Sequence, residues 1–215
     1  MGSEHVPYRR HHASMLAIVP CLMRLMPPDP ALSDEVVELR PFTLDDIPAV
    51  CAACQDPEIS RWTAMPSPYS EDHALTWINS HTELWEGGLA APFAITLGHG
   101  GPLAGNVSLA RVDWKQRVGF AGYWVASFAR NRGVASHGLV LLCGWAFDSL
   151  GLARMVLHTM IGNVASEGVA TKAGFAHIRV LPDYPNPTLG KIALNEWHLV
   201  GRADPDDGAM LTAKG

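Results

Sequence analysis

The chain has 215 residues, of which 48% are hydrophobic and 17% are charged, and its formal net charge is −5. A chain of this length buries one sizeable core, and this composition is too apolar for a disordered protein. Lysine and arginine are scattered along the sequence instead of forming a basic stripe. This distribution argues against nucleic acid as a partner.

The four cysteines include one close pair, Cys51 and Cys54. No second pair of cysteines or histidines stands at zinc-finger spacing from it. We therefore interpret the cysteines as structural thiols and expect no metal. A redox role for the pair is the alternative, because a helix N-terminus can activate one thiol of a Cys-x-x-Cys motif.

The N-terminal segment has a basic stretch at residues 9–12 before an apolar run from Met15 to Met26, which loosely resembles a signal peptide. Pro20 and Arg24 interrupt the run, which is too short to span a bilayer. We expect a mobile extension, no membrane partner and a cytoplasmic protein. The predicted division of the chain is an extension at 1–33, one domain at 34–200 and a tail at 201–215.

Hydrophobic periodicity and turn residues predict strands and helices in a mixed order. Strands are expected at Val36–Arg40, Pro92–Leu97, Leu103–Val112, Val118–Val125, Met155–Met160, Phe175–Val180 and Ile192–Val200. Helices are expected from about Asp46 to Cys54, from an N-cap at Ser70 to Gly87, from Ser136 to Ser149 and from Ala165 to Ala173. The order indicates an α/β (α+β) fold with a mixed, mostly antiparallel sheet of about seven strands flanked by helices.

The loop from Arg130 to Ala135 stands between an aromatic strand end and an apolar helix. Backbone amides at a helix N-terminus form an anion site, and Gly133 and Ala135 leave room for a pyrophosphate. The sequence lacks the Gly-Lys-Ser/Thr ending of nucleotide triphosphatases and the three spaced glycines of dinucleotide folds. An ordinary strand-to-helix turn on the surface is the alternative.

Several ordered motifs accompany this loop between residues 36 and 200. They are Arg130, Gly133 and Ala135 in the loop, Gly122, Tyr123 and Trp124 before it, and Asn163, Ser166, Lys172, Gly174 and Phe175 after it. With these motifs the chain resembles the GNAT superfamily of acetyltransferases and, within it, the RimJ/RimL branch. The resemblance implies a splayed sheet that grips acetyl-CoA and an enzyme that acetylates an amine.

Carried over from that family, the resemblance assigns most of the cofactor site. The residues implied to hold acetyl-CoA are Trp124, Val125, Ala126, Arg130, Asn131, Arg132, Gly133, Val134, Ala135, Ser136 and Asn163. It also implies that Ser166 protonates the departing thiolate and that Asn163 contacts the pantetheine arm or the acceptor side. Helix capping is the alternative for both residues. A homodimer is expected by analogy with relatives.

The acceptor is open at this stage. Relatives often carry acids where this chain has Phe120 and His137, and a late Asp is replaced near Ala193. No base is therefore carried over, and a protein N-terminal α-amine and a small-molecule amine are both candidates.

Other residues compete for a role in the reaction. His81, His158, Glu83 and Asp113 are weighed as catalytic groups against core or surface roles, and Trp62 and Tyr69, expected on a loop, as substrate contacts. A non-catalytic acyl-CoA-binding sensor or scaffold is the competing class of function, and a purely structural domain is a further alternative.

Overall fold

The computed structural model describes residues 24–63, 65–186 and 190–201. Its strands form one open sheet of eight. Its order is β1-β2-β3-β4-β5-β6-β8-β7, and every neighbouring pair is antiparallel except β5 and β6. The strands are Leu32–Ser33, Val37–Arg40, Ala91–Leu97, Leu103–Asp113, Val118–Val125, Arg154–Met160, Ala176–Asn186 and Gly190–Val200, from β1 to β8. The predicted mixed, mostly antiparallel sheet is confirmed.

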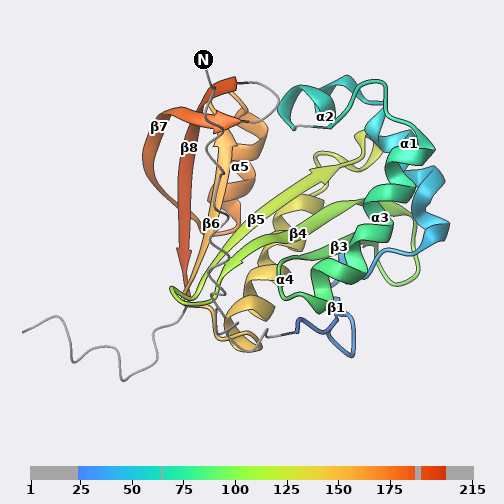
Figure 1. Ribbon diagram of the computed structural model, residues 1–215, viewed down its shortest axis with the longest axis horizontal. Helices are drawn as coiled ribbons and strands as arrows, with labels where there is room; N and C mark the ends of the chain where they lie inside the picture. The colour runs from blue at the N-terminus through green and yellow to red at the C-terminus, as the bar shows by residue number, and fades with distance from the viewer. Residues whose placement is uncertain (1–23, 64, 187–189, 202–215) are drawn as a thin grey trace, which may run out of the picture.

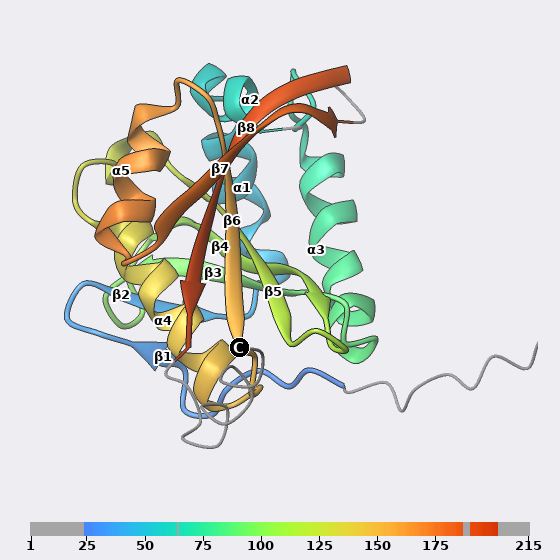
Figure 2. The ribbon, with the colours of Figure 1, turned by 90° about the vertical axis from the view of Figure 1, so that its left-hand side faces the viewer.

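Helices pack on both faces of this sheet, as Figures 1 and 2 show. They are α1 at Ile47–Cys54, α2 at Pro57–Trp62, α3 at Glu71–Glu86, α4 at Val134–Asp148 and α5 at Val164–Lys172. Buried side chains of α4 form the main core with the sheet, and a second cluster joins α1 and α3 to β3, β4 and β5. Within the described residues no helix combines the length and apolar character needed to cross a bilayer.

Local capping chemistry explains where the helices begin. Ser70 caps α3 by accepting a hydrogen bond from the amide of His73, as predicted. The helix α4 begins two residues before the predicted Ser136, because Gly133 adopts a left-handed conformation (φ 79°) and acts as its N-cap. The helix α2 was not predicted. Its Pro57 suits the first turn of a helix, and the preceding Asp56 caps it.

Two parts of residues 24–33 contact the domain, although the predicted extension included them. Leu25 is only 2% exposed, and its amide donates a 2.9 Å hydrogen bond to the carbonyl of Trp85. Leu32 and Ser33 form β1 at the edge of the sheet. Burial of one leucine and the pairing of β1 therefore join part of the predicted extension to the sheet. Residues 1–23 and 202–215 lie outside the described residues.

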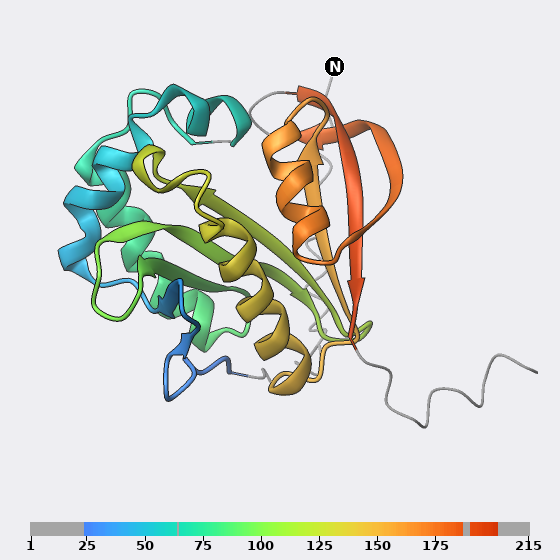
Figure 3. The same ribbon diagram turned by 180° about the vertical axis from the view of Figure 1, so that it is seen from behind.

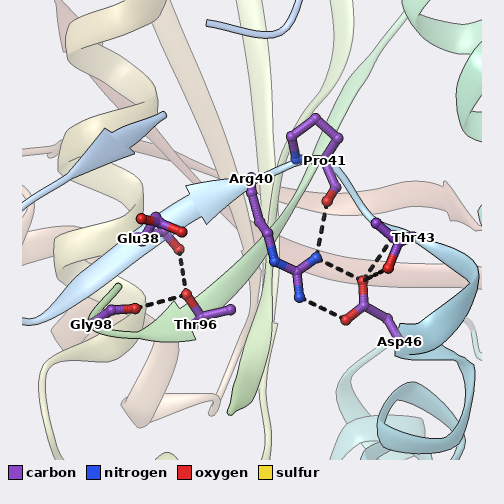
Figure 4. A network of polar contacts seen from close by, with 7 residues as sticks. All are labelled: Glu38, Arg40, Pro41, Thr43, Asp46, Thr96 and Gly98. Atoms are coloured by element: carbon purple, nitrogen blue, oxygen red, sulfur yellow. Dashed lines mark hydrogen bonds and ion pairs between the residues drawn. The ribbon is translucent and has the colours of Figure 1, made fainter. Parts of the chain in front are cut away.

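A buried polar network joins the end of β2 to α1 (Figure 4). Arg40 donates from Nη1 and Nη2 to the two carboxylate oxygens of Asp46, at 2.8 and 2.7 Å. The amide of Thr43 donates to the same carboxylate at 2.8 Å. Burial alone would raise the pKa of Asp46, but the hydrogen bonds from Arg40 and Thr43 outweigh it and leave that pKa lowered. The network fixes the entry to α1 with an ionised carboxylate.

Candidate active site

The strands β5 and β6 diverge after a short parallel contact. Only Val118–Ala121 of β5 pair with β6, on Arg154–Leu157. The last four residues of β5, Gly122–Val125, keep their pairing with β4 but have none with β6. Figure 1 shows the two strands separating from a common base. Because backbone groups need hydrogen-bond partners, the free edge of β5 is ready to pair with an extended ligand.

The loop after β5 points the first turn of α4 at the opening between these strands. Asn131 and Gly133 have φ values of 60° and 79°, which place both in the left-handed region. The first amide bonded inside the helix is that of His137, which donates to the carbonyl of Gly133 at 2.9 Å. The amides of residues 134–136 therefore have no partner within the helix. Together with the helix dipole they favour an anion at this point.

A cleft of about 620 Å³ runs over this helix N-terminus and between α2 and α5. It brings together most of the predicted site, namely Trp62, Trp124, Val125, Arg130, Asn131, Gly133, Val134, Ala135, Ser136, Asn163 and Ser166. Three predicted residues lie apart from it. Arg132 is exposed outside the cleft, and Ala126 is buried with its amide bonded to the carbonyl of Ala104. Tyr69 is only 6% exposed and packs in the second core cluster.

Arg130 holds the wall of the cleft together. Its Nη2 is 2.8 Å from Oδ2 of Asp56, and its Nε donates to the carbonyl of Val125 at 3.3 Å. The guanidinium therefore links the end of β5 to the cap of α2, and its charge is already balanced by a carboxylate. Backbone amides therefore supply most of the electrostatic attraction for an anion at this site.

The start of α5 lines the cleft from the other side. Figure 3 shows α5 on the same face of the sheet as α4. Asn163 caps this helix by accepting a hydrogen bond from the amide of Ser166 at 3.2 Å, so the capping alternative holds for Asn163. Both side chains also line the cleft, so capping does not exclude a role in binding. The Tyr123 hydroxyl donates to the carbonyl of Ser166 at 3.3 Å. Burial raises the pKa of Tyr123 to about 12, so it stays a neutral donor.

A second pocket of about 380 Å³ adjoins the cleft. The two share Trp62, Thr63, Tyr123, Trp124, Asn163 and Ser166. None of the described residues that line the second pocket is Asp, Glu, Lys or Arg, and His158 and Tyr184 are prominent among them. A ligand that lies along the free edge of β5 thus reaches this pocket at its far end.

Phe120 and His137, which stand where relatives often carry acids, contact other side chains. Phe120 lies under the guanidinium of Arg111, whose Cζ is 3.9 Å from the ring centroid. His137 is 2.7 Å from Oδ2 of Asp34, which ties the turn before β2 to the first turn of α4. Both side chains therefore take part in contacts within the fold.

The sequence-based prediction missed the helix α2 and one buried carboxylate. Trp62 ends α2 and is not on a loop, and Glu58, Ile59 and Thr63 join it along the cleft. Glu196 on β8 is 7% exposed and contacts His158, and it was not among the predicted site residues. A charge at an inward position of a strand is the signal that would have found it. His81 is buried, with both ring nitrogens unpaired among the described residues, and lies outside both pockets.

Comparison with known proteins identifies the fold and the family. The acetyltransferase (GNAT) domain family matches residues 37–176, which run from β2 to the first residue of β7. The chain belongs to the GNAT acetyltransferase family. It is therefore an acetyltransferase by family, and its splayed β5–β6 pair and the loop before α4 are the parts that carry the family motifs.

Individual relatives agree with this GNAT assignment. The chain is 24% identical over 155 residues to the uncharacterized N-acetyltransferase YoaA of Bacillus subtilis, which covers 72% of this chain and 88% of that protein. Its fold is similar to that of the ribosomal α-N-protein acetyltransferase RimL in complex with coenzyme A, with a TM-score of 0.73, 18% identity and coverage of 81% and 99%. It is also similar to the microcin C7 self-immunity acetyltransferase MccE, in complex with acetyl-CoA and AMP, with a TM-score of 0.69, 17% identity and coverage of 79% and 98%.

Proposed function

We propose that this protein transfers an acetyl group from acetyl-CoA to a primary amine. The observation that carries the proposal is the continuity of three features: the free edge of β5, the unpaired amides of α4 and the second pocket beyond them. An extended ligand with an anionic group at one end and a reactive group at the other fits that arrangement. Relatives that bind acetyl-CoA and coenzyme A support it.

The residues present suit acetyl-CoA group by group. Amides at the N-terminus of α4 can donate hydrogen bonds to a pyrophosphate. Space around Gly133 is limited, because a Cβ there would lie 3.1 Å from Cδ2 of His137. The unpaired edge at Gly122–Val125 matches the amides of a pantetheine arm. The thioester would then lie near Asn163 and Ser166, where the cleft meets the second pocket.

The chemistry we propose is direct attack of a neutral amine on the thioester carbonyl. The new C–N bond forms as the C–S bond breaks, the amine gives up one proton, and the thiolate accepts one. Backbone donors around Val125 polarise the carbonyl, and the hydroxyl of Ser166 supplies the proton for the thiolate. Ser166 is free for this role because only its backbone amide takes part in the cap of α5.

The second pocket favours an amine that is easily neutralised. It has no carboxylate among its described lining residues to compensate an ammonium ion. Deprotonating an α-amine, with a pKa of about 8, costs about 1 kcal/mol at pH 7, whereas a lysine amine with a pKa of about 10.4 costs about 5 kcal/mol. We therefore propose a protein N-terminal α-amine or a small-molecule amine of similar pKa as the acceptor, with Trp62 as a contact.

Transfer assays on matched peptides test this proposal. The purified protein is incubated with acetyl-CoA and short peptides that carry either a free N-terminus and no lysine, or a blocked N-terminus and one lysine. Free thiol is followed with a disulfide reagent, and acetylated peptide is detected by mass spectrometry. We expect acetylation of peptides with a free N-terminus. Binding of acetyl-CoA without transfer to any amine would instead indicate the sensor or scaffold function.

A further inference from the structure

A histidine that lines the second pocket pairs with a buried carboxylate on the neighbouring strand, and it is the only histidine among the described residues that line either pocket. His158 lines that pocket from β6, and its side chain is 19% exposed. Its Nε2 is 3.2 Å from Oε2 of Glu196 on the neighbouring strand β8. The pair thus lies on the acceptor side of the proposed thioester position.

The hydrogen bond to Glu196 decides which nitrogen of His158 is free. A carboxylate accepts hydrogen bonds, so Nε2 carries the proton and donates it to Glu196. The lone pair of the neutral ring is then on Nδ1. Among the described residues Nδ1 has no hydrogen-bond partner, and it is not one of the fully buried polar atoms. A basic nitrogen therefore remains available to a ligand in the pocket.

Glu196 is held as an anion by several donors. Arg179 donates from Nε and Nη2 to its two oxygens, at 3.0 and 3.4 Å, and Nε2 of His198 lies 3.2 Å from Oε1. Burial alone would raise the pKa of Glu196, but the hydrogen bonds from Arg179 and His158 outweigh it and lower that pKa. The carboxylate can therefore orient His158 throughout the neutral pH range.

Aromatic rings fix the plane of the His158 ring. The centroid of Tyr184 is 5.2 Å from it and that of Phe120 is 6.0 Å from it, both in edge-to-face geometry. Phe120 lies two residues before the unpaired stretch of β5 that begins at Gly122, so this contact places the ring of His158 close to the free edge where the ligand is proposed to lie.

We propose that His158 is the general base that takes the proton of the acceptor amine and that Glu196 is its positioning residue. The inference rests on the proposed acetyl transfer. As the amine nitrogen bonds to the carbonyl carbon and the C–S bond breaks, its proton passes to Nδ1 of His158, and the thiolate is protonated by Ser166. The imidazolium then returns its proton to solvent. The charged or titratable groups around His158 are Glu196, His198, Arg179, Tyr184 and Arg111.

The test compares His158→Gln and Glu196→Gln with a matched control, His177→Gln. His177 is exposed on β7 and lines neither pocket. Acetyl-CoA affinity is measured by calorimetry, and transfer to short peptides with a free N-terminus is followed from pH 5 to pH 9, together with hydrolysis of acetyl-CoA by water. We expect His158→Gln to lower kcat about 100-fold or more, since general bases contribute about 10²–10⁴-fold, with little change in acetyl-CoA affinity.

The pH profile separates catalysis from structure. The acceptor amine, with a pKa of about 8, makes kcat rise with pH in every variant alike, so this effect cancels in the ratio of two kcat values. The ratio of the wild-type kcat to the His158→Gln kcat should change between pH 5 and pH 9, because only the wild type has a base at this position. Glu196→Gln should lower kcat by less than His158→Gln, whereas His177→Gln should match the wild type at every pH. A ratio of wild-type to His158→Gln kcat that stays constant across this pH range would overturn the proposal. So would a wild type that binds acetyl-CoA but transfers its acetyl group to neither peptide nor water, whereas failure to bind acetyl-CoA would overturn the proposed function itself.

Discussion

Substitution of Gly133 by glutamate should remove most of the affinity for coenzyme A. The new carboxylate would lie beside the unpaired amides of α4, where the account puts the pyrophosphate. Two like charges about 5 Å apart, at an effective dielectric constant of about 20, repel by about 3 kcal/mol, which corresponds to a roughly 100-fold weaker Kd. The left-handed φ of 79° adds a backbone cost of about 1–2 kcal/mol to any residue other than glycine there.

Two control variants separate the charge from the backbone. Gly133→Ala keeps the backbone cost without the charge, so its Kd should stay within several-fold of the wild type. Gly151→Glu places the same charge at another left-handed glycine, with φ 65° and open space around it. It lies beyond the opposite end of α4, about 22 Å along the helix. Calorimetric titration with coenzyme A gives each Kd. Equal affinities for Gly133→Glu and Gly151→Glu would refute the assignment of this loop.

Three further predictions concern stability and the reaction. Burial lowers the pKa of His81 to about 4, so the unfolded chain binds a proton that the folded chain rejects as pH falls from about 6.5 to 4. Stability should drop by about 3 kcal/mol over that range in urea unfolding, and His81→Phe should abolish this drop and stabilise the protein by about 1 kcal/mol at pH 7. Asp46→Asn should destabilise by about 2–3 kcal/mol at pH 7 through the lost ionic hydrogen bonds from Arg40. Because the folded pKa of Asp46 is lowered, the gap between wild type and variant should close as pH falls below about 4, and a constant gap would contradict this. Ser166→Ala should lower kcat roughly 10-fold or more. It should not change the coenzyme A affinity or the capping of α5 by Asn163, which involves only the backbone amide of residue 166. An unchanged kcat would exclude Ser166 from the mechanism.

Much of the fold could be predicted from local chemistry. The strand Val118–Val125 has the predicted bounds because a polar turn precedes it and its hydrophobic run is uninterrupted. Ser70 and Gly87 bound α3 as expected, since each supplies a capping preference that depends on few neighbours. The packing of Leu25 could not be foreseen, because it depends on a contact with Trp85 about sixty residues away.

The two halves of the site differ in the same way. The part of the cleft around Gly133 is built by one loop and the first turn of the helix after it, so consecutive residues revealed it, whereas the walls from α2 and α5 come from distant segments. The second pocket draws on β5, β6, β7 and β8, and its His158–Glu196 pair joins residues 38 positions apart. Nothing in either segment alone indicates that they meet. Tyr69 shows the converse error, since an aromatic residue in a proline-rich turn proved to be part of the core.

A crystal structure with bound coenzyme A would show where the cofactor lies, on which the proposed function depends. We predict the pyrophosphate on the amides of Gly133–Ser136, the pantetheine arm paired with the free edge of β5, and the thiol near Ser166 facing the second pocket. Coenzyme A bound elsewhere, or with β5 and β6 closed upon each other along Gly122–Val125, would contradict it.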